Sequence, residues 1–207
     1  MYKKLIFPLL FLISFTNINI KTFSQDIDID ILKKINIERN KKLDNTFNFF
    51  SNSVYILSPS IPIGLFLSGY ILEEDSLLQS GFNMGVSIFS VTATSLLLKN
   101  ITKKQRPYDK YSTIDNVIIE KNYSMPSSHT AIAFSTATYI SLYYPKWYII
   151  IPSYLWATTV AYSRLHLGVH YPSDVIVGAI IGSGISYLSY RIQKYINEKK
   201  TLELIKL

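Results

Sequence analysis

Long apolar runs with few charges alternate with short polar connections along most of this chain. A helix that crosses a bilayer needs about 20 mostly apolar residues. Five runs near that length follow residue 44, and they lie at about 47–72, 77–98, 127–144, 147–163 and 175–191. The pattern predicts an all-α fold, a multi-pass transmembrane helical bundle of about five spans that follow an N-terminal signal peptide or anchor.

The first 43 residues divide into two segments of different character. Two lysines and a short apolar stretch are typical of a secretory signal peptide over residues 1–24, with an uncleaved anchor as the alternative. In residues 25–43, apolar side chains are interspersed with lysines, as in a helix that lies on the bilayer surface. A solvated linker fits this second segment equally well. We expect a membrane-embedded domain at 44–195 and a cytoplasmic tail at 196–207.

Composition and charge narrow the class of protein further. Hydrophobic residues make up 48% of the chain and charged residues 17%, which is too apolar for an ordinary soluble domain. The formal net charge is +7, but the positive residues flank apolar runs instead of covering one face. This distribution favours anionic lipid or phosphate, and not nucleic acid, as the partner. Because the chain has no cysteine, disulfides and thiolate metal sites are excluded.

The number of spans places two polar loops on the same side of the membrane. Two complete crossings separate the loop at 99–125 from the loop at 163–174. If the N-terminal lysines stay in the cytoplasm, both loops lie outside it and the lysine-rich tail lies inside, as the positive-inside tendency favours. We therefore predict a cell-membrane protein in which the loops at 99–125 and 163–174 are extracytoplasmic. Six positive residues on the outer side break the same tendency and call for a functional reason: Lys99, Lys103, Lys104, Arg106, Lys110 and Lys121.

Eight residues suited to catalysis or anion binding fall at the predicted outer ends of the spans. They are Lys99, Arg106, Ser127, Ser128, His129, Arg164, His170 and Asp174. Pro126 suits the first turn of the third span, and either of the two serines after it can cap that helix. Free backbone N–H groups at a helix start bind anions, and arginine side chains match the geometry of phosphate. The sequence thus predicts a phosphate site.

Three blocks of sequence carry these residues. They read Lys-x6-Arg-Pro at 99–107, Pro-Ser-Ser-His at 126–129 and Ser-Arg-x5-His-x3-Asp at 163–174. In order and internal spacing they resemble the signature of the type 2 phosphatidic acid phosphatase superfamily, and three agreeing blocks are far more specific than one. One position departs, because the family usually has glycine where this chain has Ser128. A backbone N–H serves there in either case, but the serine side chain can narrow the pocket.

The resemblance implies a role for each residue. His170 would be the nucleophile that forms a phosphohistidine, Asp174 would fix its tautomer, and His129 would be the general acid and then the base. The phosphoryl group would be held by a second set: Lys99, Arg106, Ser127, Ser128 and Arg164. No metal ion or other cofactor is implied.

The resemblance also implies the reaction class, which is hydrolysis of a phosphate monoester or diphosphate on a membrane lipid. Phosphatidic acid, phosphatidylglycerol phosphate, a polyprenyl diphosphate and a lipid A phosphate all present the same reacting group. Vanadium haloperoxidases resemble the same blocks, but the multiple spans disfavour a soluble oxidant producer. A non-enzymatic lipid-phosphate binder or transporter is the other alternative. A missing nucleophile or acid would favour it, and both histidines are present.

A metal site is the alternative reading of the third block. His166, His170 and Asp174 are spaced four apart and could share one helical face. However, the stretch lacks the glutamate of a zincin helix, and Gly168 and Pro172 argue against a continuous helix. We expect His166 to pack or to hydrogen-bond nearby.

Overall fold

The computed structural model describes residues 23–204, with side chains from 26 to 199. Its helices are α2 (Phe23–Ile37), the 3-10 turn η2 (Lys41–Leu43), α3 (Asp44–Ile71), α4 (Asp75–Thr102), α5 (Pro107–Lys110), α6 (Ser128–Tyr143), α7 (Trp147–His166) and α8 (Pro172–Leu204). The described part contains no strand, so the all-α prediction is confirmed. Most of the predicted signal peptide lies outside the described residues.

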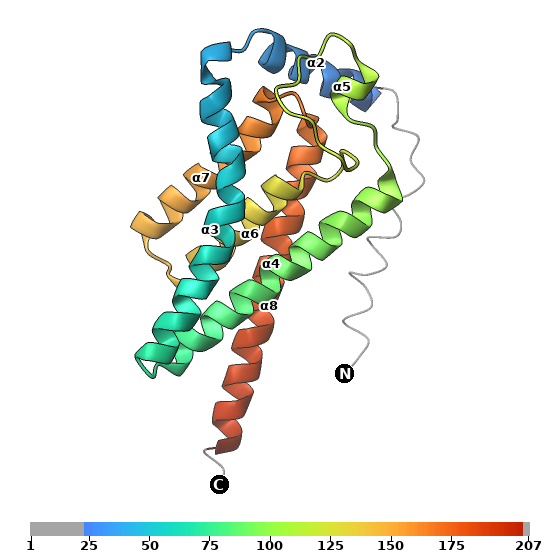
Figure 1. Cartoon of the computed structure of the whole chain (residues 1–207). Coiled ribbons are helices and arrows are strands. Elements are labelled where there is room, and N and C mark those ends of the chain that lie inside the picture. The colour runs from blue at the N-terminus through green and yellow to red at the C-terminus, as the bar shows by residue number, and fades with distance from the viewer. Residues whose placement is uncertain (1–22, 205–207) are drawn as a thin grey trace.

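The five long helices form one bundle, in which α3 pairs with α4 and α6 packs against both α7 and α8 (Figure 1). They correspond to the five predicted apolar runs. Gly178 and Gly182, which are four residues apart on α8, let α6 and α8 approach closely, as small residues at this spacing do between membrane helices. A Cβ atom on Gly182 would lie 2.1 Å from the carbonyl oxygen of Ala131, and one on Gly178 would lie 2.6 Å from that of Ser127.

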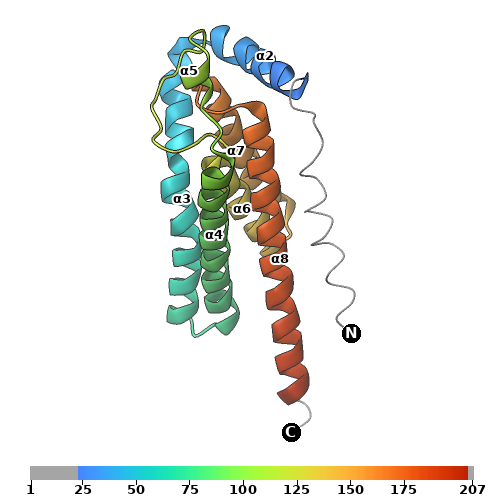
Figure 2. The same cartoon turned by 90° about the vertical axis from the view of Figure 1, so that its right-hand side faces the viewer.

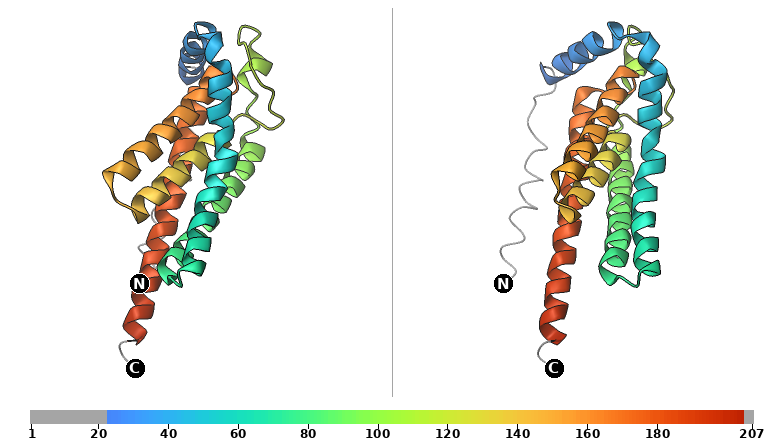
Figure 3. Two further views of the ribbon diagram at one scale, coloured as in Figure 1. Left: turned by 60° about the vertical axis from the view of Figure 1, so that its left-hand side comes forward. Right: turned by 90° about the vertical axis from the view of Figure 1, so that its left-hand side faces the viewer.

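Three stretches are long and apolar enough to cross a membrane: Lys41–Ile71, Asp75–Lys110 and Pro172–Lys199. They contain α3, α4 and α8, and α8 extends past the other helices at the end opposite α2 (Figures 2 and 3). This is the architecture of a multi-pass helical membrane protein. The helices α6 and α7 are shorter, with 16 and 20 residues. Whether they cross as the third and fourth spans stays a prediction.

One end of the bundle carries all the polar connections that hold candidate site residues. The loop after α4, the short helix α5 and the junction between α7 and α8 lie together at this end, while the α3–α4 turn and the last turns of α8 lie at the other (Figure 1). The two loops therefore lie at the same end of the bundle, and their position on one side of a membrane stays a prediction. Which side of the membrane this end faces stays a prediction.

The helix α2 lies across this polar end of the bundle (Figure 2). Its buried residues Ile29 and Leu32 pack against Ile114 and Tyr171, so part of its apolar surface contacts protein. Ile31, also among its apolar residues, is 43% exposed and remains available to a bilayer. The helix thus covers the connections of the site from above.

Candidate active site

His170 and Asp174 form a buried pair at the junction between α7 and α8. The helix α7 ends at His166, and Gly168, with a φ of +72°, turns the chain before α8 begins at Pro172. His170 Nδ1 lies 3.4 Å from Asp174 Oδ2. The same carboxylate oxygen accepts hydrogen bonds from the Ser124 hydroxyl and from the backbone N–H of Tyr171. The i, i+4 spacing of the motif thus yields a histidine held by a well-anchored carboxylate.

A neighbouring arginine identifies the ring nitrogen of His170 that holds a lone pair. Arg106 Nη1 lies 3.2 Å from His170 Nε2. Because a guanidinium can only donate, Nε2 must accept, and the ring proton belongs on Nδ1, facing Asp174. Burial lowers the pKa of His170 to about 3; Arg106 and Arg164 add to this effect, and the hydrogen bond to Asp174 opposes it. The ring is therefore neutral near pH 7, with Nε2 in the form that a nucleophile requires.

Two of the predicted phosphate-binding cations are buried and also hold the loop that follows α5. Lys99 Nζ donates to the carbonyl oxygen of Tyr123 at 2.6 Å. Arg106 donates from Nε to the carbonyl oxygen of Asn122 at 2.8 Å and from Nη1 to that of Val169 at 2.9 Å. Both side chains line the same cavity as His170. Positive charge is thus concentrated beside the lone pair of His170.

The third predicted cation, Arg164, is fully buried and already has an anionic partner. It donates to the carboxylate of Glu120 and to the hydroxyl of Ser51. Glu120 Oε2 also lies 4.0 Å from Arg106 Nη2. Sequence analysis did not single out Glu120, although it is one of few acidic residues in a loop rich in lysine and arginine. Arg164 does not line the cavity that contains Lys99, Arg106 and His170, whereas its partner Glu120 does.

The start of α6 supplies the fourth side of the site. Ser127 is the N-cap, and its hydroxyl oxygen accepts from the backbone N–H of Thr130. The prediction that Pro126 lies in the first helical turn is wrong: the helix begins at Ser128, since Ser127 makes the capping bond, and Pro126 precedes the cap. The backbone N–H of Ser127 donates to the carbonyl oxygen of Asp174 at 3.0 Å, which joins α6 to the catalytic pair.

These groups surround a cavity of about 180 Å³. His129 and Ser128 line it from α6, Lys99 from α4, Arg106 from the loop after α4, and His170 from the junction between α7 and α8. The His129 ring packs edge to face against Tyr55, with ring centroids 5.0 Å apart. Five of the eight predicted site residues therefore line the cavity, and Ser127 caps the helix beside it. Asp174 pairs with His170, and Arg164 pairs with Glu120.

A second polar network supports Asp174 from the side away from the cavity. Lys104 Nζ lies 2.9 Å from Asp174 Oδ1 and 3.2 Å from Asp28 Oδ2, so one ammonium group bridges two carboxylates. Asp28 belongs to α2 and also accepts from the backbone N–H and hydroxyl of Ser173 in the first turn of α8. No motif or periodicity of the sequence predicts that residues 28 and 174 lie close together.

His166 has partners of its own and does not join His170. Its Nε2 lies 2.8 Å from Asp44 Oδ1, and its ring packs on Phe47. The prediction that it packs or hydrogen-bonds nearby is confirmed. Between residues 26 and 199, no group of three or more His, Asp or Glu side chains is arranged to hold a metal ion.

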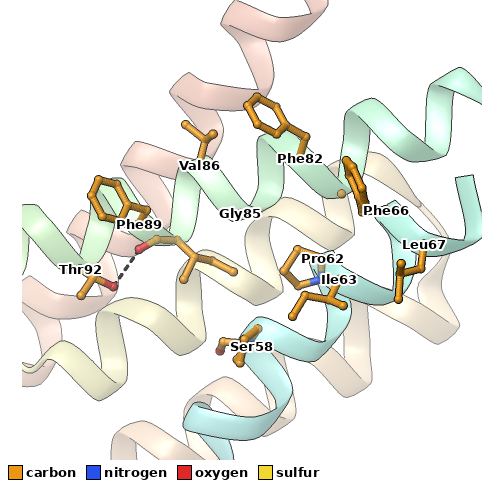
Figure 4. Close-up of a pocket in the computed structure, with 13 residues that line it drawn as sticks. Ser58, Pro62, Ile63, Phe66, Leu67, Phe82, Gly85, Val86, Phe89 and Thr92 are labelled. Carbon is orange, nitrogen blue, oxygen red and sulfur yellow. Dashed lines mark hydrogen bonds between the residues drawn. The ribbon is translucent and has the colours of Figure 1, made fainter. Parts of the chain in front are cut away.

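An apolar groove of about 680 Å³ runs between α3 and α4 below the polar cavity (Figure 4). Its lining includes Pro62 and Phe66 from α3 and Gly85, Phe89 and Thr92 from α4. Thr92 also lines the catalytic cavity, so the two spaces meet at this residue. Gly85 faces open space, because a Cβ atom there would have no neighbour within 4 Å. A polar pocket with an apolar extension fits an amphipathic ligand.

Comparison with known proteins agrees with this geometry. A family model described as the PAP2 superfamily matches residues 80–198, more than half of the chain. The chain therefore belongs to the PAP2 superfamily. The match covers most of α4, all of α6 and α7 and most of α8, and it includes all three sequence blocks.

Individual relatives and solved structures are similar in part or in whole. Undecaprenyl-diphosphatase of Sulfolobus acidocaldarius is 41% identical over 85 residues, which are 41% of this chain and 41% of that protein. Lipid A 4'-phosphatase of Bacteroides thetaiotaomicron is 34% identical over 101 residues, 46% of this chain and 45% of that protein. These alignments span less than half of either relative.

The crystal structure of Aquifex aeolicus LpxE aligns with a TM-score of 0.67 at 27% identity, over 80% of this chain and 95% of that chain. The PAP2-type phosphatidylglycerolphosphate phosphatase of Bacillus subtilis aligns with a TM-score of 0.73 over 95% of this chain and 98% of that chain. At 21% identity, this second likeness concerns the fold alone.

Proposed function

We propose that the protein is a membrane phosphatase that hydrolyses a phosphate monoester or diphosphate of a lipid at the extracytoplasmic face, through a phosphohistidine intermediate. One observation carries the proposal. The Nδ1 atom of His170 faces a carboxylate and its Nε2 atom faces a guanidinium, in a cavity that Lys99 and His129 also line.

In the first step, His170 Nε2 attacks phosphorus as the bond from phosphorus to the leaving oxygen breaks. The Arg106 hydrogen bond to Nε2 passes to a phosphoryl oxygen, which frees the lone pair. His129 donates a proton to the leaving oxygen, so the lipid alcohol or lipid phosphate departs protonated. The imidazole becomes a cationic phosphohistidine, and Asp174 stabilises its positive charge as the carboxylate does in a catalytic triad.

In the second step, water attacks phosphorus and the phosphorus–nitrogen bond breaks. His129, now neutral, accepts a proton from the water, and inorganic phosphate leaves. Throughout both steps, Lys99 and Arg106, together with the N–H groups at the start of α6, offset negative charge on the equatorial oxygens. Every proton transfer is thereby assigned to a side chain of this site.

The groove between α3 and α4 supports a lipid as the substrate. It is lined almost entirely by apolar side chains and meets the catalytic cavity at Thr92. A hydrocarbon chain in this groove would place its phosphate head beside His170. The relatives named above are described as phosphatases of undecaprenyl diphosphate and of lipid A, which share a phosphorylated head and long hydrocarbon chains.

Release of inorganic phosphate from a panel of purified lipids tests the proposal. The panel includes a phosphatidic acid, a phosphatidylglycerol phosphate, a polyprenyl diphosphate and a lipid A phosphate. We expect release from at least one, and His170→Ala should lose about 10⁴-fold or more in turnover. The same variant should form no acid-labile, base-stable phosphoenzyme.

His166→Ala is the matched control, since this histidine is equally buried but pairs with Asp44. It should remain largely active. A metal enzyme would be indicated instead if chelation abolished activity and zinc restored it. Turnover that survived His170→Ala would also contradict the proposal.

A further inference from the structure

Glu120 places a carboxylate among the cations of the catalytic cavity. Among the described residues that line this cavity, it is the one acid. Its carboxylate accepts from Arg164 and lies 4.0 Å from Arg106, and its side chain is 24% exposed. Arg164, by contrast, is fully buried. A phosphoryl group that enters the cavity therefore meets Glu120 before it can reach Arg164.

The backbone around Glu120 is held in a defined position. The Tyr108 hydroxyl accepts from the backbone N–H of Glu120 at 3.1 Å and donates to its carbonyl oxygen at 3.2 Å. Tyr108 follows Pro107 in the first sequence block, so the loop is tied to the same segment as Arg106. These two backbone hydrogen bonds thus fix the position from which the Glu120 carboxylate contacts Arg164.

Phosphate and Glu120 require the same donors. The fork of an arginine matches either a carboxylate or a phosphoryl group, and two anions side by side repel each other. We propose that Glu120 is an internal anion that occupies part of the phosphate-binding site and is displaced from Arg164 by the phosphoryl group of the substrate. This inference rests on the proposed function, because it assumes that the cavity receives phosphate.

Such a residue determines specificity because it weakens the binding of small anions more than the binding of lipid phosphates. Inorganic phosphate must displace Glu120 using its own contacts with the cations. A lipid phosphate also gains from the contact of its hydrocarbon chain with the groove between α3 and α4. Glu120 would therefore favour release of the phosphate product and limit inhibition by it. The ion pair between Glu120 and Arg164 would form again after phosphate leaves the site.

Binding of inorganic phosphate tests the proposal without any turnover. The protein carries His170→Ala, and its affinity for phosphate is measured by titration calorimetry with Glu120 present or replaced by Gln. Glutamine keeps the size of the side chain and removes its charge. We expect Glu120→Gln to bind phosphate about tenfold more tightly or better, since one repulsive charge is gone.

Glu38→Gln is the matched control, because this exposed glutamate follows α2, does not line the cavity and forms no ion pair with the side chains described at 26–199. It should leave phosphate affinity within about twofold of the parent, as expected for an exposed, screened charge. If both variants tighten binding equally, the effect is one of general charge, and the specific role of Glu120 is refuted. Unchanged or weaker binding by Glu120→Gln also refutes it.

A second measurement allows for a loss of stability in Glu120→Gln, which leaves a buried arginine without its ion pair. Phosphate should raise the melting temperature of this variant by more than it raises that of the parent, because phosphate replaces the missing anion. A smaller rise would overturn the proposal. Both readouts use a catalytically inactive background, so they are separable from the lipid panel: tighter phosphate binding can occur even if no lipid is hydrolysed.

Discussion

At the residue scale, the site depends on a histidine that stays neutral. His170 is buried between a carboxylate at Nδ1 and a guanidinium at Nε2. The guanidinium can only donate, and this fixes the tautomer before any substrate arrives. Burial, the largest effect, and the two arginines lower the pKa of His170 to about 3. In the proposed mechanism, His170 is therefore a preorganised nucleophile that does not have to lose a proton at neutral pH.

This depressed pKa predicts how activity depends on pH. A base remains active above its pKa, so deprotonated His170 should persist far below the ordinary histidine value of about 6.5. We expect kcat/KM to show no loss near pH 6.5 that is attributable to His170, and its acid limb should lie well below pH 5. Loss of the proton that His129 donates to the leaving oxygen would set the basic limb, so the profile should be bell-shaped.

Ionisation of the substrate must be separated from that of the enzyme, because a phosphate monoester has its second pKa near 6. Two aryl phosphates with different second pKa values serve this purpose. A limb that moves with the substrate belongs to the phosphate. An acid limb fixed near pH 6.5 for both substrates would show that His170 titrates normally, and the preorganised neutral nucleophile would be disproved.

At the element scale, sequence pattern predicted the helices well and their mutual contacts poorly. The five apolar runs correspond to α3, α4, α6, α7 and α8 because membrane helices follow from local hydrophobic length. The three motif blocks likewise located the site, since their residues lie at helix ends on one side of the bundle. Glu120 and Asp28 were missed. Their roles depend on a loop and a helix folding back over the site, which local pattern does not encode.

The groove between α3 and α4 gives the element scale its own prediction. Gly85 lies on the groove wall with open space in front of it, so a large side chain there should fill the groove without clashing with the backbone. Gly85→Phe should lower kcat/KM for a long-chain lipid phosphate by about tenfold, as expected when a hydrocarbon chain loses several buried CH₂ groups. Hydrolysis of a short, water-soluble phosphate ester should be unchanged.

Gly184→Phe is the matched control for this groove. Gly184 also faces open space, but it lies on α8 and does not line the groove. It should leave both substrates unaffected. Equal losses on the lipid and on the short ester in Gly85→Phe would mean that the substitution disturbs the catalytic cavity, and the groove would then lose its assigned role.

At the scale of the whole molecule, the site explains why positive residues collect at one end of the bundle. Lys99, Lys104 and Arg106 are each committed to the cavity or to Asp174, and not to a cytoplasmic membrane surface. Their presence at the polar end of the bundle therefore does not argue against the prediction that this end faces outward. A second group of positive residues lies in the far part of α8, at the end opposite the cavity, where the cytoplasmic side is predicted: Arg191, Lys194 and Lys199.

Cysteine labelling measures this orientation directly, because the natural chain has no cysteine. Thr113 lies in the exposed loop at the polar end, while Ser76 and Lys199 are exposed at the opposite end. In intact cells, an impermeant thiol reagent should label Thr113→Cys and should reach Ser76→Cys and Lys199→Cys only after permeabilisation. The two far positions control for each other, since they lie on different helices. Labelling of both far positions in intact cells, with Thr113→Cys protected, would reverse the predicted topology: the cavity would then meet lipid phosphates of the cytoplasmic leaflet, while the chemistry at His170 would be unchanged.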